Sequence, residues 1–295
     1  MSSPQQTTDK PLTPRHAWQP LTPRGVAAFA IATLTRLVLV QIIVAVLVAL
    51  TLIWFLRVAC FPVITEATRQ LPAGTAIRRA TLTYPGESPV RLAENAHLAI
   101  IVDLDGARKA ATASDLEIIF ESNRVAFCGA LGCRWQPYPR GFLFTLDRAA
   151  VEPAWGAWRW PIVIAVALTV GLASFVSWWA LALVYLPFVK IVIFFADRDA
   201  TWRGAWRMTA AGLLPGALML AGGVILYGFG AIDLFRFGLI YALHLIAGLV
   251  FVFTSPFFLP KIFRGKPKGN PFSRPRATSA GQKSGPGSNP FSPRE

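Results

Sequence analysis

Few residues in this chain have the types and spacing that chemistry requires, and two cysteines come first among them. Cys128 and Cys133 have four residues between them, and a glycine beside each permits a tight loop. A disulfide between them suits an oxidising compartment, and two free thiols are the alternative. Zinc would need four ligands, and only His97 and Cys60 are further candidates nearby. We therefore expect no metal site, with Cys60 left over.

One histidine, His244, lies inside a long apolar run. An ionisable residue within a membrane is costly, so it is a candidate intramembrane functional residue, as a proton or ligand site. The alternative is a neutral imidazole that is hydrogen-bonded to Ser174, Ser177 or Tyr227 on a neighbouring helix. No Asp or Glu lies deep in any apolar run to pair with it, and both interpretations stay open.

A third group of residues concerns helix packing. Gly212 and Gly216 have the spacing that lets two helices approach closely, so they form a candidate helix-packing face. Pro215 lies between them in the chain and should kink the helix. The face could join two copies of the chain in a homo-oligomer or pack helices within one chain.

Catalytic motifs are otherwise missing from the sequence. It contains no His-Glu metal-binding pair, no phosphate-binding loop and no Gly-x-Ser-x-Gly. We therefore expect no enzyme and no cofactor.

Four long apolar runs must position these residues. They cover residues 37–56, 162–189, 208–229 and 237–259. A bilayer core of roughly 30 Å needs about 20 apolar residues in a helix, so each run is long enough to span it. The pattern predicts a polytopic α-helical membrane protein with four transmembrane helices.

The distribution of charge predicts how the chain is threaded. Residues 1–36, 190–207 and 261–295 together carry 16 basic and 4 acidic residues, whereas residues 57–160 carry 12 basic and 10 acidic. Because cytoplasmic loops collect Lys and Arg, both termini are expected in the cytoplasm and residues 57–160 outside, in a bacterial inner membrane. Anionic lipid then explains the net charge of +14, and no nucleic-acid partner is expected.

The polar segment between the first two runs predicts a small, mainly-β extracytoplasmic domain. Residues 62–71 form an expected amphipathic helix, and residues 98–104 a strand that ends in the hairpin-type turn Asp105-Gly106. Residues 116–121 and 124–127 should form a second hairpin around Ser122-Asn123, and residues 141–146 a last strand.

The chain therefore divides into five parts. These are a disordered basic tail (1–36), an anchor helix (37–56), the extracytoplasmic domain (57–160), a three-helix transmembrane bundle (161–260) and a second disordered basic tail (261–295). The tails are rich in Pro, Gly, Ser and Lys, a composition that buries too little apolar surface to offset chain entropy.

Residues 100–106 read Ile-Ile-Val-Asp-Leu-Asp-Gly, which resembles the first motif of the haloacid-dehalogenase-like phosphatases. In that family the first Asp is the nucleophile and the second a general acid/base, positions that Asp103 and Asp105 occupy here. Ala107 replaces the expected Thr, and no later acidic pair has a spacing suited to Mg²⁺. A strand that ends in a tight turn accounts for the same residues.

The last third of the chain resembles the Yip-type membrane-protein superfamily. The similarity lies in Trp206-Arg207, Leu213-Leu214-Pro215, Leu226-Tyr227-Gly228, Ile232-Asp233-Leu234 and residues 241–244. The layout is similar to a bacterial family of unknown function in that group, with an anchor helix, an extracytoplasmic insert and a helical bundle. Asp103, Gly106 and residues 143–147 would fit the insert. The eukaryotic relatives are linked to membrane trafficking through protein partners.

These observations predict a non-enzymatic inner-membrane protein that organises or docks partners or lipid. Its expected partners are the lipid bilayer and membrane or extracytoplasmic proteins. The alternative is a transporter or an accessory subunit of a transport system, which would give His244 a role. An extracytoplasmic phosphatase, through Asp103 and Asp105, is the third hypothesis.

Overall fold

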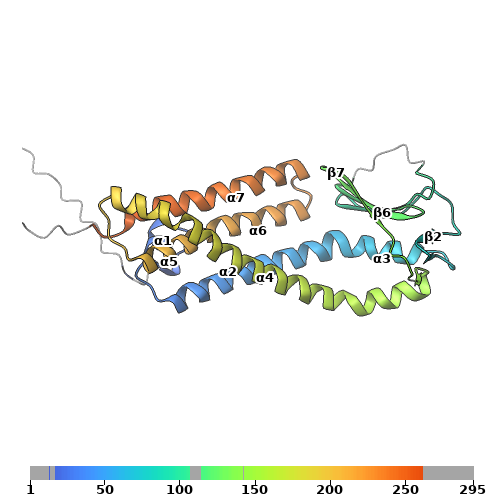
Figure 1. Cartoon of the computed structure of the whole chain (residues 1–295), viewed down its shortest axis with the longest axis horizontal. Coiled ribbons are helices and arrows are strands. Elements are labelled where there is room, and N and C mark those ends of the chain that lie inside the picture. The colour runs from blue at the N-terminus through green and yellow to red at the C-terminus, as the bar shows by residue number, and fades with distance from the viewer. Residues whose placement is uncertain (1–12, 14–16, 107–113, 142, 262–295) are drawn as a thin grey trace, which may run out of the picture. The chain divides into compact units, whose positions relative to one another are not determined.

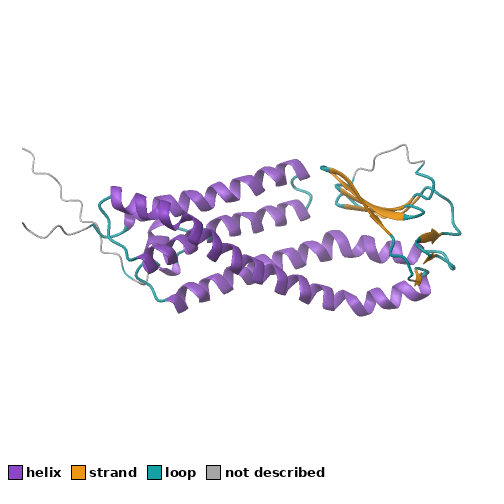
Figure 2. Ribbon diagram, in the orientation of Figure 1, coloured by secondary structure: helices purple, strands orange, loops and turns teal. Residues whose placement is uncertain are grey.

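The structure, a computed structural model, describes residue 13 and residues 17–106, 114–141 and 143–261 (Figure 1). Four helical stretches are long and apolar enough to cross a membrane: Leu34–Gln70, Arg148–Phe195, Trp202–Gly228 and Leu234–Phe258. A small β-region lies between the first two in the chain (Figure 2).

The first stretch is one continuous helix of three parts. Helix α2 (Leu34–Phe55) passes through a π-helical turn, η2 (Leu56–Cys60), into α3 (Phe61–Gln70). The N–H of Phe61 donates to the carbonyl of Leu56, and the next residue, Pro62, has no N–H to continue the normal ladder. The separate helix predicted at residues 62–71 is thus joined directly to the anchor.

The other long helices complete the bundle. Helix α4 (Arg148–Phe195) begins where Asp147 accepts a hydrogen bond from the Ala150 N–H, well before its apolar run. Helices α5 (Trp202–Gly212) and α6 (Leu214–Gly228) are separated at Leu213, two residues before Pro215, where the sequence predicts a kink. Helix α7 (Leu234–Thr254) ends in a 3₁₀ turn, η3 (Ser255–Phe258). Helix α2 packs against both α4 and α6, so it belongs to the bundle and is not a separate anchor.

The segment before α2 differs from the expected disordered tail. Helix α1 (Pro23–Ala28) packs against α5, α7 and η3, and Val26 and Phe29 are fully buried. Thr22 caps the helix by accepting from the Gly25 N–H at 3.0 Å, and Pro23 occupies its first turn. The expected disorder of residues 1–12 and 262–295 lies outside the described residues.

In the described part of the chain, eight short strands form two sheets. One sheet has the order β3-β4-β5-β6-β7 and the other β2-β1-β8. The strands are β1 (Ala76–Arg78), β2 (Thr81–Thr83), β3 (Val90–Glu94), β4 (Leu98–Val102), β5 (Leu116–Phe120), β6 (Arg124–Gly129), β7 (Gly132–Pro137) and β8 (Leu143–Thr145).

The predicted strands agree with the structure only in part. The hairpin of β5 and β6 is confirmed, and β8 lies within residues 141–146. The hairpin predicted at Asp105-Gly106 is wrong, because β4 pairs with β3 in antiparallel and with β5 in parallel. Two parallel strands cannot be joined by a hairpin turn. The connection between them must be longer, because the second strand starts at the same end of the sheet as the first.

Helix α3 covers one face of the five-stranded sheet. Val63 and Ala67 of α3 are buried against Leu98, Ile100 and Val102 of β4. Burying a side chain of this size contributes about 1.5–3 kcal/mol, so this contact fixes the sheet on the end of the first long helix.

Candidate functional site

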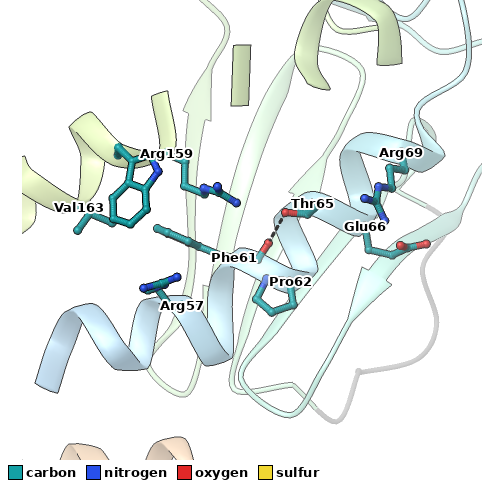
Figure 3. Close-up of a pocket in the computed structure, with 9 residues that line it drawn as sticks. Arg57, Phe61, Pro62, Thr65, Glu66, Arg69, Arg159 and Val163 are labelled. Atoms are coloured by element: carbon teal, nitrogen blue, oxygen red, sulfur yellow. Dashed lines mark hydrogen bonds between the residues drawn. The ribbon is translucent and has the colours of Figure 1, made fainter. Parts of the chain in front are cut away.

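A cleft of about 510 Å³ lies between the η2–α3 segment and α4 (Figure 3). We call it the arginine cleft. Arg57 of η2 and Arg159 of α4 both line it, and in Figure 3 the apolar side chain of Phe61 lies between them, with Val163 beside Arg159. The other lining residues are Pro62, Thr65, Glu66, Arg69 and Trp160. Both arginines adjoin apolar runs, since Arg57 follows residues 37–56 and Arg159 precedes residues 162–189.

The cleft carries a net positive charge, since three arginines and one glutamate line it. Arg69 forms an ion pair with Glu152, with its Nε 3.8 Å from Oε1. Among the described residues, neither Arg57 nor Arg159 forms an ion pair with a carboxylate. The two guanidinium groups are therefore available to an anion.

Trp160 lies beside both free guanidinium groups. The Cζ atom of Arg57 is 5.4 Å from the centroid of the Trp160 ring, and that of Arg159 is 6.0 Å from it. Cations at such distances are attracted to the ring face by about 0.5–1 kcal/mol at exposed sites. The ring thus holds two like charges near one another without neutralising either.

The wall of the cleft is held in place by contacts of Trp155 in α4. The indole Nε1 donates to the Thr65 hydroxyl at 3.0 Å, and that hydroxyl donates to the Phe61 carbonyl at 2.8 Å. The rings of Trp155 and Phe61 meet edge to face, with centroids 5.2 Å apart. These contacts hold α3 against α4 on one side of the cleft.

The side chains of the arginine cleft suit binding better than catalysis. Among the described residues that line it, the only hydroxyl is that of Thr65, which already has two hydrogen-bond partners. Glu66 is the only carboxylate among the described residues that line the cleft, and no histidine, cysteine or aspartate accompanies it there. Guanidinium groups bind phosphate and carboxylate well, and the apolar walls would accommodate a hydrocarbon portion of the same ligand.

An apolar cavity of about 160 Å³ lies on the opposite face of α3. Ile64 and Ala67 of α3, Leu92 of β3 and Ile100 of β4 are among the side chains that line it. Tyr84 also lines the cavity, and burial raises the pKa of its hydroxyl. Helix α3 therefore presents a charged face to the arginine cleft and an apolar face to this cavity.

A polar junction links the β-region to the helical bundle. The Tyr227 hydroxyl of α6 donates to Asp115 Oδ2 at 2.5 Å, and His97 Nδ1 lies 3.8 Å from the same oxygen. The His97 ring also contacts Tyr227 and Phe55, with centroids 4.6 and 5.5 Å apart. We call these four residues the junction.

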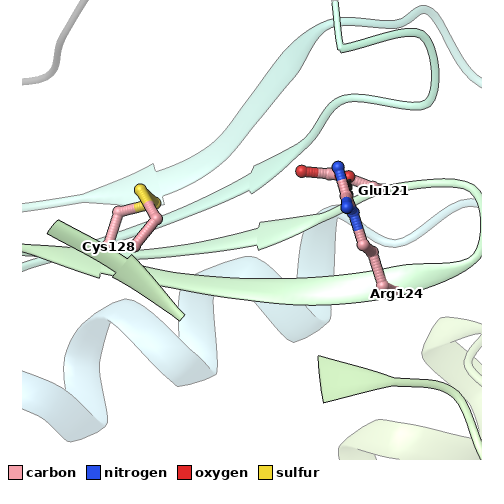
Figure 4. Close-up of a disulfide and its surroundings, with 4 residues drawn as sticks. Glu121, Arg124 and Cys128 are labelled. Carbon is pink, nitrogen blue, oxygen red and sulfur yellow. Dashed lines mark hydrogen bonds and ion pairs between the residues drawn. A yellow bond between two sulfur atoms is a disulfide. The ribbon is translucent and has the colours of Figure 1, made fainter. Parts of the chain in front are cut away.

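The two predicted cysteines lie opposite each other in β6 and β7 (Figure 4). Cys128 and Cys133 are bonded in a disulfide, with Cα atoms 4.0 Å apart. Sulfur atoms in a disulfide cannot act as thiolate ligands, and no group of three or more metal-binding side chains occurs in the described part of the chain. Cys60 is a free, half-buried thiol.

The two other predicted sites lie within the bundle. The half-buried His244 contacts the Tyr241 carbonyl one turn earlier in its own helix, and not Ser174, Ser177 or Tyr227. A Cβ atom at Gly216 would lie 2.4 Å from the carbonyl oxygen of His244, and one at Gly212 would lie 2.8 Å from the Val252 side chain. The small residues therefore pack α5 and α6 against α7 within one chain.

The two aspartates of the phosphatase-like motif lie in different environments. Asp103 is buried just after β4, whereas Asp105 is exposed two residues later.

The arginine cleft and the junction were both missed from sequence. The available signal was that Arg57 and Arg159 follow and precede apolar runs, but only the structure shows that they face one cleft.

Comparison with known protein families, with curated protein sequences and with solved structures finds no match to this chain. The resemblance to the Yip-type superfamily therefore stays a prediction.

Proposed function

We propose that the chain is a non-enzymatic integral membrane protein that crosses a bacterial inner membrane four times and binds anionic lipid at its outer surface. The four long apolar helices support the membrane part of this proposal. The excess of basic residues in segments 1–36, 190–207 and 261–295 supports cytoplasmic termini and an extracytoplasmic β-region.

The observation that carries the lipid part is that Arg57 and Arg159, beside Trp160 in the arginine cleft, have no carboxylate partner among the described residues. Each arginine adjoins an apolar run, so in a membrane both would lie at the level of lipid headgroups. A phospholipid has the matching chemistry: its phosphate would bind the guanidinium groups, and its acyl chain would lie along Phe61 and Val163.

The β-region would then act as a docking module next to the bound lipid. Helix α3 forms one wall of the arginine cleft and also packs against the five-stranded sheet, so lipid in the cleft would contact the element that positions the sheet. A partner protein that binds the sheet would therefore be brought to a defined lipid environment.

The test is to isolate the protein from its native membrane in polymer-bounded nanodiscs and to quantify the lipids that accompany it. Wild-type protein is expected to be enriched in anionic phospholipid over the bulk membrane, and the Arg57→Gln/Arg159→Gln variant is expected to lose the enrichment. Arg236→Gln is the matched control, because Arg236 is at the same end of the bundle but is paired with Asp233. Bulk lipid composition around all three proteins would refute the proposal.

A further inference from the structure

The turn between β6 and β7 lies at the end of the sheet where strands β4 and β5 begin. Strands β4 and β5 are parallel, and Leu116, the first residue of β5, pairs with Gly129 of β6. Gly129 in turn pairs with Gly132 of β7. The segment Cys128–Cys133, which we call the hairpin tip, therefore lies next to Asp115, the residue that precedes β5.

The contacts of the junction hold this end of the sheet against the end of the helical bundle. Asp115 is hydrogen-bonded to Tyr227, the penultimate residue of α6, and His97 contacts Phe55, the last residue of α2. The apolar parts of both helices end at these residues. The hairpin tip is consequently held near the boundary between the apolar and polar parts of the bundle.

The hairpin tip is apolar and uncovered. Between the two cysteines the chain reads Gly-Ala-Leu-Gly, without a charged residue, and Leu131 is 106% exposed. Leu116 and Phe127, on one face of the sheet beside the tip, are 43% and 42% exposed. Apolar side chains gathered in this way mark a contact with a membrane or another protein.

The surroundings of the tip favour lipid over protein. Trp135, two residues after Cys133, is exposed in β7. Tryptophan is typical of membrane interfaces. Two further exposed aromatic side chains, Phe229 and Phe235, flank the loop between α6 and α7 at the same end of the bundle. The tip and this loop thus both present exposed apolar side chains at the end of the bundle to which Asp115 is bonded.

We propose that the hairpin tip inserts into the outer surface of the same bilayer that the helices span, with Leu131 below the headgroups. The inference rests on the proposed membrane-spanning role of the four helices. The disulfide between Cys128 and Cys133 keeps the inserted turn closed, and the hydrogen bond between Asp115 and Tyr227 sets its height. The β-region is then bound to the membrane on two sides, through α3 and through the tip.

The test places an environment-sensitive fluorescent amino acid at single positions of the full chain in phosphatidylcholine–phosphatidylglycerol nanodiscs. Leu131 is replaced in one sample, Leu168 in the middle of α4 in a second, and Glu87 in the β2–β3 loop in a third. All three side chains are exposed in the structure, so the replacements leave the fold intact. Quenching is measured with nitroxide-labelled lipid and with iodide in the solvent.

Insertion predicts that the probe at Leu131 is blue-shifted relative to the probe at Glu87, is quenched by labelled lipid and is shielded from iodide. Quenching of Leu131 by iodide alone, with Leu168 still quenched by lipid, would overturn the inference and leave the membrane-spanning proposal intact. A probe at Leu131 that is shielded from both quenchers would also overturn it, because protein would then cover the tip. Failure of lipid to quench Leu168 would overturn both proposals.

Discussion

At the end of the bundle where α1, α5 and η3 meet, each of three basic side chains donates to a backbone carbonyl of another segment. Lys190 binds Ala200 at 2.8 Å, Arg198 binds Leu259 at 2.5 Å, and Arg207 binds Ala30 at 3.1 Å. At the opposite end, Arg57 and Arg159 lie near the ring of Trp160.

The difference separates two uses of the same residue type. Arginine and lysine residues next to apolar runs help to determine how a membrane protein is oriented in the bilayer. A cation that already donates to carbonyls also holds helix ends together, whereas one without an anionic partner is free to bind a ligand. We therefore expect the first set to determine stability and the second to determine lipid binding.

The largest expected effect on stability is that of Arg207→Met. The change removes a charged donor from the carbonyl of Ala30, in the segment between α1 and α2. A hydrogen bond of this kind contributes roughly 1.5–3 kcal/mol, so the free energy of unfolding in mixed micelles should fall by about 2 kcal/mol. The control is Arg203→Met, at an exposed position of the same helix, which should change it by less than about 0.5 kcal/mol. If Arg207→Met and Arg203→Met lowered the free energy of unfolding equally, the bond to the Ala30 carbonyl would not be stabilising and the two classes of basic residue would not differ in this way.

The second effect concerns the junction. Tyr227→Phe deletes the hydroxyl that donates to Asp115 and leaves the ring contacts in place. Loss of a hydrogen bond to a charged acceptor should weaken the attachment of the sheet by about 1.5 kcal/mol. Hydrogen exchange should then accelerate at the amides of Asp115 and Leu116, which are bonded to the carbonyls of Ala96 and His97.

The matched control for the junction is Tyr241→Phe, because Tyr241 is exposed in α7. Unchanged exchange at Asp115 and Leu116 in the Tyr227 variant would mean that other contacts hold the sheet.

A smaller effect on folding is expected from the arginine cleft itself. The Arg57→Gln/Arg159→Gln variant loses only contacts with the exposed ring of Trp160. Its free energy of unfolding in lipid-free micelles should therefore change by less than about 1 kcal/mol. A loss as large as that of Arg207→Met would identify these arginines as structural and would contradict their assignment to a ligand.

The smallest effect is expected for His244→Ala. The imidazole contacts its own helix at Tyr241, so stability should change by less than about 0.5 kcal/mol. Reconstituted vesicles should show the same proton permeability with either protein. A proton- or substrate-linked flux that disappears in the variant, with folding intact, would instead favour the transport hypothesis.

Local patterns were sufficient to predict several elements of the fold. The apolar runs predicted four long helices, and Ser122-Asn123 predicted the β5–β6 hairpin. The kink predicted at Pro215 lies two residues after the boundary between α5 and α6. Helix α1 carried a local signal too, since Thr22 and Pro23 form a typical helix start, but the Pro-rich composition around them suggested a disordered tail.

The rest depends on contacts between distant parts of the chain. Strands β4 and β5 pair in parallel, so that Leu98 lies opposite Leu116, and no local periodicity encodes this pairing. Tyr227 and Asp115 are 112 residues apart, and Arg57 and Arg159 meet only because α2 and α4 pack together. Because the chemistry of both sites comes from such pairs, sequence reasoning predicted the cysteine pair and the glycine packing face, which are local patterns, but neither the arginine cleft nor the junction.

The most direct measurement is the affinity of the purified protein for phosphatidylglycerol and for phosphatidylcholine, obtained by native mass spectrometry of single bound lipids. The account predicts that wild-type protein and Arg236→Gln prefer phosphatidylglycerol, and that the Arg57→Gln/Arg159→Gln variant binds it at least about tenfold more weakly. Equal affinity of all three proteins for the anionic lipid would contradict a lipid site between Arg57 and Arg159.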